Sequence, residues 1–453
     1  MIINSLILAF LIRLLNLDQS LWLDEAIGAL VVRNMNFWDI LTKFPLMDNH
    51  PPLYYLVLKV WTFLFGYTEV ALRLPSVFFG VLTAYLVHKI TRNRYITLLV
   101  ATSPFLVYYS QEARMYMMAA FLATWAVYLY LNKKFIGFSI AITLLIFTDY
   151  VPVFLLPVFI IYSVIKKENV KKTLLSYLPM AVLGLFWLPT FLYQINVGKT
   201  LSITLPAWQE LAGGATIKQV VVMWNKLILG RISFFPKTYY YLLVVISSVP
   251  FVITLIRSFK KVNLFFWMWF LIPLVLGFVT SFIFPAFIYF RFLYVVPAFY
   301  ILVGQTKNKI LISMMLLVNL IGCGIYLLDK NQQRESWKEA VSFVESTIGE
   351  DEAVVINYPE AFAPYRWYSK DKWLKVASVA DSIFVNKVLT ENKVERSIQN
   401  EKGVYYFNYL EDLTDPSSVV RNKLTELGFE NIKTYTFNGV GEVEYLRLNE
   451  NSN

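Results

Sequence analysis

The sequence is poor in cysteine and histidine. Its 453 residues include one cysteine, Cys323, which lies inside an apolar run, and only two histidines. A single cysteine cannot form an intramolecular disulfide, and it also excludes a cysteine-rich metal site. Two histidines leave little material for a zinc centre built on imidazole ligands. The fold must therefore be stabilised by other means than disulfides or structural zinc.

Charged residues are scarce as well. They make up 16% of the chain, whereas hydrophobic residues make up 57% and aromatic residues 17%. A soluble globular chain has about 45–50% apolar and about 25% charged residues. The low charge excludes a disordered chain, and 18 glycines with 18 prolines exclude a collagen-like one. This composition predicts an integral membrane protein.

The net charge of +10 is unevenly distributed along the chain. Residues 329–453 hold 15 basic and 21 acidic residues, a net charge of −6, whereas residues 1–328 hold 26 basic and 10 acidic residues, a net charge of +16. A basic apolar part followed by an acidic tail indicates membrane topology rather than a nucleic-acid-binding groove.

Apolar segments recur throughout residues 1–328. A membrane-spanning helix needs about 17–25 mostly apolar residues. We predict a polytopic α-helical membrane protein with eleven spans near residues 2–17, 75–91, 95–109, 115–131, 135–148, 151–165, 173–193, 238–256, 264–284, 292–304 and 310–328.

The loops between these segments predict the orientation. Five short loops, one after every second span, together hold 14 basic residues and one acidic residue, Glu168. The other nine acidic residues of this part lie in the opposite set of loops. Because basic loops remain on the cytoplasmic side, we expect a multi-pass cell-membrane protein with a cytoplasmic amino terminus and an extracytoplasmic tail.

Two outer loops complete the predicted membrane module, residues 1–328. The first, residues 18–74, contains an apolar stretch at 51–66 that would invert every later loop if it crossed the membrane, so we place it as an interfacial helix at the outer face. The second, residues 194–237, contains Pro206, Trp208 and Gly213-Gly214 and is long enough to act as a lid.

The tail, residues 329–453, has the pattern of a soluble α/β domain. Residues 336–348 and 419–427 have helical periodicity, and residues 354–356, 404–407 and 443–448 are typical of strands. The tail contains no glycine-rich phosphate loop, so nothing in it indicates a nucleotide site.

Ionisable and aromatic residues collect at the predicted outer face. A polar residue at membrane depth is costly and is therefore a candidate functional residue. Arginines bind phosphate through paired hydrogen bonds, and a carboxylate accepts the proton of an attacking hydroxyl. The set suits an anionic lipid-linked substrate and comprises Asp24, Glu25, His50, Tyr54, Arg73, Glu112, Arg114, Tyr116, Asp149, Tyr289 and Arg291.

Several of these residues also have a simpler interpretation. Asp24 and Glu25 could complement the dipole of a following helix, and Asp149 could cap one. Arg73 and Arg291 could reach lipid head groups, as terminal arginines do. Only the gathering of so many such residues at one membrane surface favours a site.

Four strings of residues near these positions resemble the GT-C superfamily of membrane glycosyltransferases. The resemblance is to the branch of protein O-mannosyltransferases (glycosyltransferase family 39) and the lipid A aminoarabinose transferase, and it extends over the chain in order. The strings are Trp22-Leu23-Asp24-Glu25-Ala26, His50-Pro51-Pro52-Leu53-Tyr54-Tyr55, Ala71-Leu72-Arg73-Leu74-Pro75-Ser76 and Ser110-Gln111-Glu112-Ala113-Arg114-Met115-Tyr116.

This resemblance implies an inverting glycosyltransferase that uses a polyprenyl-phosphate sugar donor, a hexose or a pentose, at the outer membrane face. The acceptor would be a hydroxyl of a protein, lipid or glycan. Asp24 matches the catalytic aspartate of the family, with Glu25 beside it, and His50 and Arg73 match positions near the carrier phosphate. Glu112 matches an acidic position that faces sugar or acceptor. Some members use a divalent cation, for which Asp24, Glu25, Asp48 and His50 could supply ligands.

Two other functions remain as alternatives. One is a transferase of a phospholipid-type head group, and the other is a flippase or transporter of lipid-linked sugars. A transporter would place ionisable residues at mid-membrane and show broken helices in an inverted repeat. The ionisable residues of this chain lie at the ends of the predicted spans, which favours the transferase.

Overall fold

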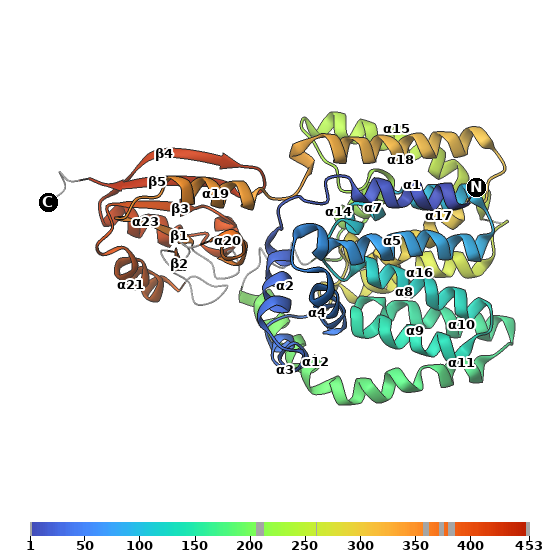
Figure 1. Cartoon of the computed structure of the whole chain (residues 1–453). Coiled ribbons are helices and arrows are strands. Elements are labelled where there is room, and N and C mark those ends of the chain that lie inside the picture. Colours follow the sequence, from blue (N-terminus) through green and yellow to red (C-terminus); the bar gives the residue numbers. More distant parts are fainter. Residues whose placement is uncertain are drawn as a thin grey trace. The chain divides into compact units, whose positions relative to one another are not determined.

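The computed structural model describes residues 2–204, 213–259, 261–356, 362–370, 376–378 and 386–449. The chain is mostly helical, with a small carboxyl-terminal sheet, and it divides into two compact units (Figure 1). The helical unit takes its described residues from Met1–Leu17, Met35–Ile203 and Gln209–Gln332. The tail unit takes its described residues from Asp18–Asn34, Thr204–Trp208 and Gln333–Asn453.

The helical unit is built from apolar helices joined by short connections. Helices α1, α5, α8 and α9 contact one another in that order (Figure 1). The elements are α1 (Ile2–Leu14), α3 (Phe37–Thr42), η1 (Phe44–Leu46), α4 (Leu53–Phe65), α5 (Glu69–Thr91), α6 (Arg94–Ala101), α7 (Pro104–Ser110), α8 (Tyr116–Leu131), α9 (Phe135–Thr148), η2 (Val151–Leu155), α10 (Leu156–Lys166), α11 (Val170–Ser176), α12 (Leu178–Thr204), α14 (Ile217–Leu229), α15 (Lys237–Ser258), α16 (Leu264–Thr280), η3 (Tyr289–Val295), α17 (Val296–Gly304), α18 (Lys309–Leu328) and η4 (Lys330–Gln332).

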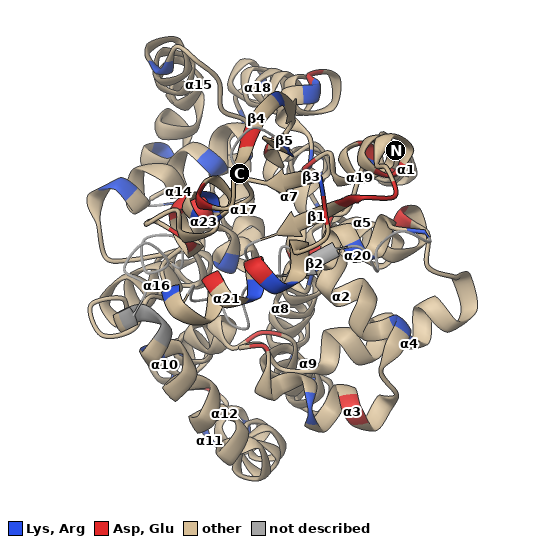
Figure 2. Cartoon of the chain, turned by 90° about the vertical axis from the view of Figure 1, so that its left-hand side faces the viewer, with Lys and Arg blue, Asp and Glu red and all other residues tan. Residues whose placement is uncertain are grey.

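Each of the eleven predicted spans coincides with one or two of these helices. Among the described residues, four helical stretches are long and apolar enough to cross a membrane: Glu69–Thr91, Val170–Thr200, Lys237–Ser258 and Lys309–Leu328. Large apolar side chains lie on their outside, with Leu185 69% and Phe186 82% exposed. Most of the helical ribbon in Figure 2 is neither basic nor acidic. These features fit helices that face lipid, and the number of spans stays a prediction.

The predicted span at residues 95–109 consists of two short helices, α6 and α7. Pro104 cannot donate a backbone hydrogen bond, and it disfavours helical geometry at the residue before it. Ser103 instead caps α7, since its hydroxyl accepts from Leu106 N–H at 3.3 Å. The break leaves carbonyls of α6 without helical partners. The buried Arg13 of α1 donates to one of them, Ala101 O, at 2.7 Å, and to Ser110 Oγ at 2.9 Å.

The tail unit contains a five-stranded sheet in the order β2-β1-β3-β5-β4. Strands β2, β1 and β3 are parallel, whereas β5 runs antiparallel to both β3 and β4. The predicted helices and strands of the tail are confirmed. Its elements are α2 (Leu23–Asn34), α19 (Trp337–Thr347), β1 (Glu352–Ile356), α20 (Phe362–Tyr368), β2 (Val376–Ser378), α21 (Lys387–Ile398), β3 (Gly403–Phe407), α22 (Glu411–Thr414), α23 (Val419–Glu426), β4 (Phe429–Phe437) and β5 (Gly441–Leu448).

Helices cover both faces of this sheet. Alternate residues of a strand point to opposite faces, so Val354 and Ile356 of β1 join one core cluster while Val355 joins the other. Helices α19 and α20 contribute to the first cluster, and α21 and α23 contribute to the second. The tail therefore has the three layers of an α/β domain.

Residues 18–34 pack with the tail unit, although about 300 residues separate the two in the chain. Leu23 of α2 lies in the core cluster that contains Trp337. Leu21 N–H donates to the Tyr368 hydroxyl at 2.6 Å, and the Arg33 guanidinium lies 4.5 Å from the centre of the Trp367 ring. Our sequence-based boundaries assign this segment to the first outer loop instead.

Candidate functional site

A pocket of about 370 Å³ lies in the helical unit, where the ends of several elements meet. It joins ionisable side chains to an apolar wall, and His50, Asp149 and Arg291, three of the predicted site residues, line it. The other lining residues are Asn49, Tyr150, Val151, Val153, Phe154, Phe191, Gln194, Ile195, Lys199, Thr280, Ile283, Phe284 and Ala286.

A chain of hydrogen bonds runs from this pocket to Arg114. His50 Nδ1 lies 2.8 Å from Asp48 Oδ1, and the Tyr55 hydroxyl donates to Asp48 Oδ2 at 2.9 Å. Arg114 Nη1 in turn donates to the Tyr55 hydroxyl at 2.9 Å. Burial opposes the charge on Asp48, but His50, Arg114 and the Tyr55 hydroxyl hold its pKa at about 2. Asp48 is therefore a carboxylate that orients His50 and Tyr55.

Asp149 follows α9 at the polar end of the pocket. Its side chain is 4% exposed, and its Oδ1 accepts from Val151 N–H at 3.1 Å. Burial raises the pKa of Asp149, while His50, the Val151 N–H and the guanidinium groups of Arg291 and Arg114 act in the opposite direction. Arg291 Nη1 also donates to Pro285 O at 2.9 Å. The structure thus brings His50, Arg114, Asp149 and Arg291 into one electrostatic group.

Arg73 and Glu112 lie on neighbouring elements of the same unit. Arg73 is almost completely buried, and its Nη1 donates to Leu17 O, just beyond α1, at 3.0 Å. One turn later on α5, Ser76 Oγ donates to Glu112 O at 2.6 Å. The first bond joins the beginning of α5 to the segment after α1, and the second joins it to the turn between α7 and α8.

Three predicted tyrosines belong to aromatic clusters. The Tyr54 ring packs against Tyr55 at 5.6 Å between centroids, and the Tyr116 ring packs against Phe290 at 5.1 Å. Tyr289 also contacts Phe290, at 5.3 Å. Tyr54 and Tyr116 are buried and Tyr289 is half-buried, so this part of the unit is well packed and rich in hydroxyl groups.

Asp24 and Glu25 belong to the tail unit, in the first turn of α2. Leu23 and Ile27 lie one turn apart and pack into the tail core. Successive helical residues are about 100° apart, so Glu25 points away from that core and Asp24 to its flank. Glu25 is fully buried, whereas Asp24 is partly exposed. Only Asp24 of the pair is therefore partly accessible in this arrangement.

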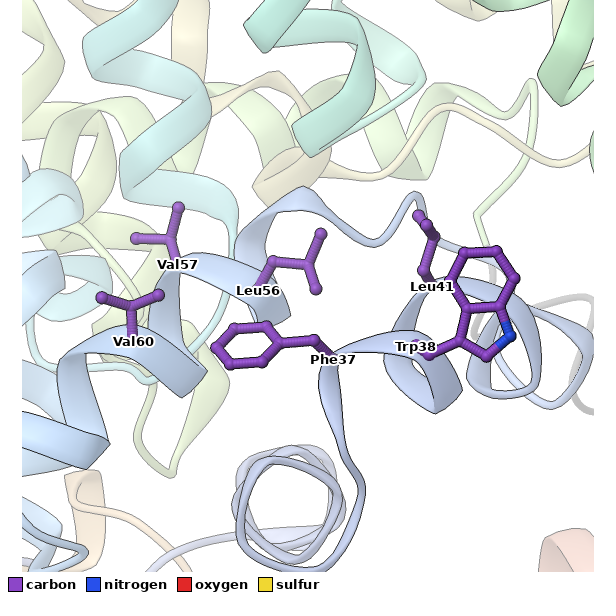
Figure 3. Close-up of a pocket in the computed structure, with 6 residues that line it drawn as sticks. All are labelled: Phe37, Trp38, Leu41, Leu56, Val57 and Val60. Carbon is purple, nitrogen blue, oxygen red and sulfur yellow. The ribbon is translucent and has the colours of Figure 1, made fainter.

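Helices α3 and α4 form an open apolar groove (Figure 3). Trp38 is 68% exposed and Phe63, on α4, is 84% exposed. Such apolar exposure suits the predicted position of residues 51–66 at the membrane interface. The groove is lined by Phe37, Trp38, Leu41, Leu56, Val57 and Val60.

Sequence reasoning missed several polar residues of the pocket. Gln194 Nε2 donates to Asp48 O at 2.8 Å, and Gln194 Oε1 accepts from the Tyr150 hydroxyl at 2.7 Å. The notable sequence signal was a lone glutamine at the end of a long apolar run. Lys199, one turn further along α12, also lines the pocket.

The described residues contain no group of three or more His, Cys, Asp or Glu side chains that could hold a metal ion. Part of the predicted lid, residues 205–212 with Pro206 and Trp208, lies outside the described residues.

Comparison with solved structures identifies the fold. Two crystal structures of ArnT from Cupriavidus metallidurans match over nearly the whole of both chains. The apo structure has a TM-score of 0.53 and 11% identity, covering 98% of this chain and 96% of ArnT. The structure bound to undecaprenyl phosphate has a TM-score of 0.52 and 12% identity, covering 99% and 97%.

The fold is that of ArnT. The predicted resemblance to GT-C membrane glycosyltransferases is therefore confirmed at the level of the fold. No protein-family model matches the chain, and no curated protein sequence matches it either. At 11–12% identity, the likeness of the folds alone does not carry the function of individual residues across.

Proposed function

We propose that this protein is an inverting glycosyltransferase that moves a sugar from a polyprenyl-phosphate carrier to an acceptor hydroxyl at the outer membrane face. The observation that carries the proposal is the pocket in the helical unit. It combines His50 and Arg291, which suit a phosphate group, with an apolar wall that suits a prenyl chain. The ArnT structure bound to undecaprenyl phosphate supports a carrier of this class.

In this proposal the carrier phosphate binds to His50 and Arg291, together with Arg73. Arginine holds phosphate oxygens through paired hydrogen bonds, and the Asp48 carboxylate orients the His50 ring. The phosphate is a good leaving group, so a second catalytic acid of the glycosidase type is not needed. Arg114, Glu112 and Asp149, with the hydroxyls of Tyr54, Tyr116 and Tyr289, orient the sugar or the acceptor.

Asp24 is the proposed general base, and Glu25 positions it. The acceptor oxygen bonds to the anomeric carbon from the face opposite the phosphate, and its proton passes to the Asp24 carboxylate. The bond between the anomeric carbon and the phosphate oxygen breaks, and the carrier leaves as a phosphate monoester. The partial exposure of Asp24 and the complete burial of Glu25 support this division of roles.

The proposed orientation can be tested by labelling single cysteines in intact cells, in a Cys323→Ser background. Lys218→Cys, on the exposed side of α14, and cysteines in the tail should react with an impermeant reagent. Asn169→Cys, between α10 and α11, should react only after permeabilisation. Labelling of position 169 in intact cells would overturn the orientation.

The proposed activity can be tested with the purified protein and a panel of sugar donors labelled in the sugar. Polyprenyl-monophosphate sugars should support transfer to a membrane or protein acceptor fraction, and nucleotide sugars should not. Transfer of a phosphorylated head group would favour the phospholipid-type alternative, and movement of intact donor across vesicles without transfer would favour the flippase.

A further inference from the structure

A second group of cations lies in the helical unit, around the end of α14. Lys226 lies in the last turn of α14, Arg231 follows that helix, and Lys237 begins α15. None of the three appears among the residues that line the pocket of His50 and Arg291.

A glycine fixes the position of this group. Gly230 ends α14 with a φ of +71°, which favours glycine, and its N–H donates to Lys226 O at 3.0 Å. A Cβ at this position would lie 2.9 Å from Pro104, the first residue of α7. The close approach brings the next residue, Arg231, to α7, where its Nη1 donates to the Tyr108 hydroxyl at 2.8 Å.

The two lysines lie beside aromatic rings and neutral oxygens. Lys226 Nζ lies 5.7 Å from the centre of the Tyr289 ring and 3.5 Å from Ile232 O. Lys237 Nζ donates to Ser233 Oγ at 2.6 Å. Gln332 holds Ser233 in place, accepting from its N–H at 2.9 Å and donating to its carbonyl at 2.8 Å. The backbone at Ser233, between Arg231 and Lys237, is thus held through both its N–H and its carbonyl group.

Negative charge is missing from the immediate partners of these cations. None of the three forms an ion pair with a carboxylate in the part of the chain that the structure describes. Burial, together with the charges of Arg231 and Lys237, lowers the pKa of Lys226 to about 7. Glu112 offsets part of the charge of Arg231, but like charges that are crowded together still disfavour the folded chain unless an anion binds there.

Tyr109 supplies a further observation at the same place. Its side chain is 2% exposed, and its hydroxyl has no hydrogen-bond partner among the described residues. Arg231, Tyr289 and Glu112 are among the charged or titratable groups that act on it. A buried hydroxyl is normally hydrogen-bonded, so this one is available to donate to a bound oxygen.

We propose that Lys226, Arg231 and Lys237, with the Tyr109 hydroxyl, form a second anion site that takes a phosphate monoester. A monoester carries a charge of about −1.5 to −2 near neutral pH and has three acceptor oxygens, which match three basic side chains and a hydroxyl donor. Arg231 is exposed, so a ligand can reach the site. The phosphate could belong to a lipid carrier or be free in solution.

The segment η3 places the two sites next to each other in the chain. Tyr289, at its start, contacts Lys226, and Arg291, two residues later, lines the pocket that we assign to the donor. The second site does not depend on that assignment, because it is argued from its own cations. A transferase of the proposed kind nevertheless releases a carrier monophosphate, which is a ligand of the class that the second site would bind.

Direct binding measurements test this proposal without requiring activity. The probes are inorganic phosphate and a short-chain polyprenyl monophosphate in detergent, measured with wild-type protein and with Lys226→Gln, Arg231→Gln and the double variant. Lys218→Gln, on the exposed side of the same helix, is the matched control. Size-exclusion profiles and melting temperatures report folding, and Lys237→Gln provides a further variant should another fail to fold.

We expect affinity to fall at least about tenfold in each single variant and further in the double variant, with Lys218→Gln unchanged. Loss of affinity for both probes would identify a site for the phosphate group itself. Loss for the prenyl probe alone would identify the lipid carrier as its source. Wild-type affinity for both probes in the folded double variant would overturn the proposal. Arg291→Gln, measured in parallel, reports separately on the donor pocket.

Discussion

The two compact units hold their candidate site residues in different ways. In the helical unit, His50 and Arg114 are joined through Asp48 and Tyr55 by side-chain hydrogen bonds, next to an apolar pocket. In the tail unit, α2 is held by apolar packing of Leu23 into the core cluster of Trp337, and the segment before it is bonded to the tail through Leu21 and Ser20. The candidate binding groups are thus fixed by a polar network, whereas α2, which carries the carboxylate pair, is anchored in the core of the tail unit.

This difference suggests a role for the tail. A buried polar network keeps its geometry because each broken bond leaves a costly unpaired group. A helix packed on a domain core keeps its geometry only as long as that core is present. If Asp24 is the base, the tail acts as the element that positions it.

The largest expected effect comes from Asp24→Asn. Asparagine caps a helix as well as aspartate does, so a purely structural role predicts a loss of only about 0.3–1 kcal/mol. If Asp24 is the general base, asparagine cannot accept the proton of the attacking hydroxyl. Turnover should then fall by roughly 10²–10⁴-fold, while donor affinity and melting temperature stay at their wild-type values. Glu25→Gln should have a milder effect. Near-normal turnover in Asp24→Asn would remove Asp24 from the mechanism.

A smaller effect is expected from Arg291→Lys in the other unit. Lysine keeps the charge but loses paired hydrogen bonding to phosphate, so donor binding should weaken by about 1–3 kcal/mol with little change in melting temperature. Arg257→Lys, an exposed position at the end of α15, is the matched control. Equal donor affinities in the two variants would indicate that Arg291 does not bind the carrier.

The smallest expected effect tests the role of the tail. Tyr368→Phe removes the hydrogen bond to Leu21 N–H, which is worth about 0.5–1.5 kcal/mol. We expect kcat to fall about two- to tenfold with the donor KM unchanged, because α2 becomes less precisely held.

Tyr445→Phe is the control for this variant. It removes a hydrogen bond to Glu352 in the same unit, at 2.6 Å, between strands rather than on α2. Its kcat should stay at the wild-type value. Equal losses of kcat in both variants would show that general destabilisation of the tail, and not the position of α2, is responsible.

The sequence predicts the secondary structure better than it predicts the partners of each element. The length of the apolar segments predicts most of the helices, and alternating patterns such as those around Val354 and Val404 predict three strands, because burial imposes those periodicities. The break at Ser103-Pro104 was missed, although proline gave a local signal for it. Charge patterning suggested the orientation but carries no information on packing.

The remaining features depend on contacts between residues far apart in the chain. Leu23 packs against Trp337, and no local pattern in residues 18–34 indicates that partner. The site residues were proposed from motifs, and of these the structure groups His50, Arg114, Asp149 and Arg291. Lys226 and Arg231 are not among the predicted site residues, because in the sequence a basic residue of an outer loop resembles any solvated charge until its buried neighbours are known.

The stoichiometry and stereochemistry of one turnover test the central claim most directly. Purified protein would be incubated with a polyprenyl-monophosphate sugar of known anomeric configuration and an acceptor, and both products would be quantified. The account predicts one equivalent of polyprenyl monophosphate released for each sugar transferred, with the opposite anomeric configuration in the glycoside. Retention of configuration, or sugar transfer without release of the carrier monophosphate, would contradict it.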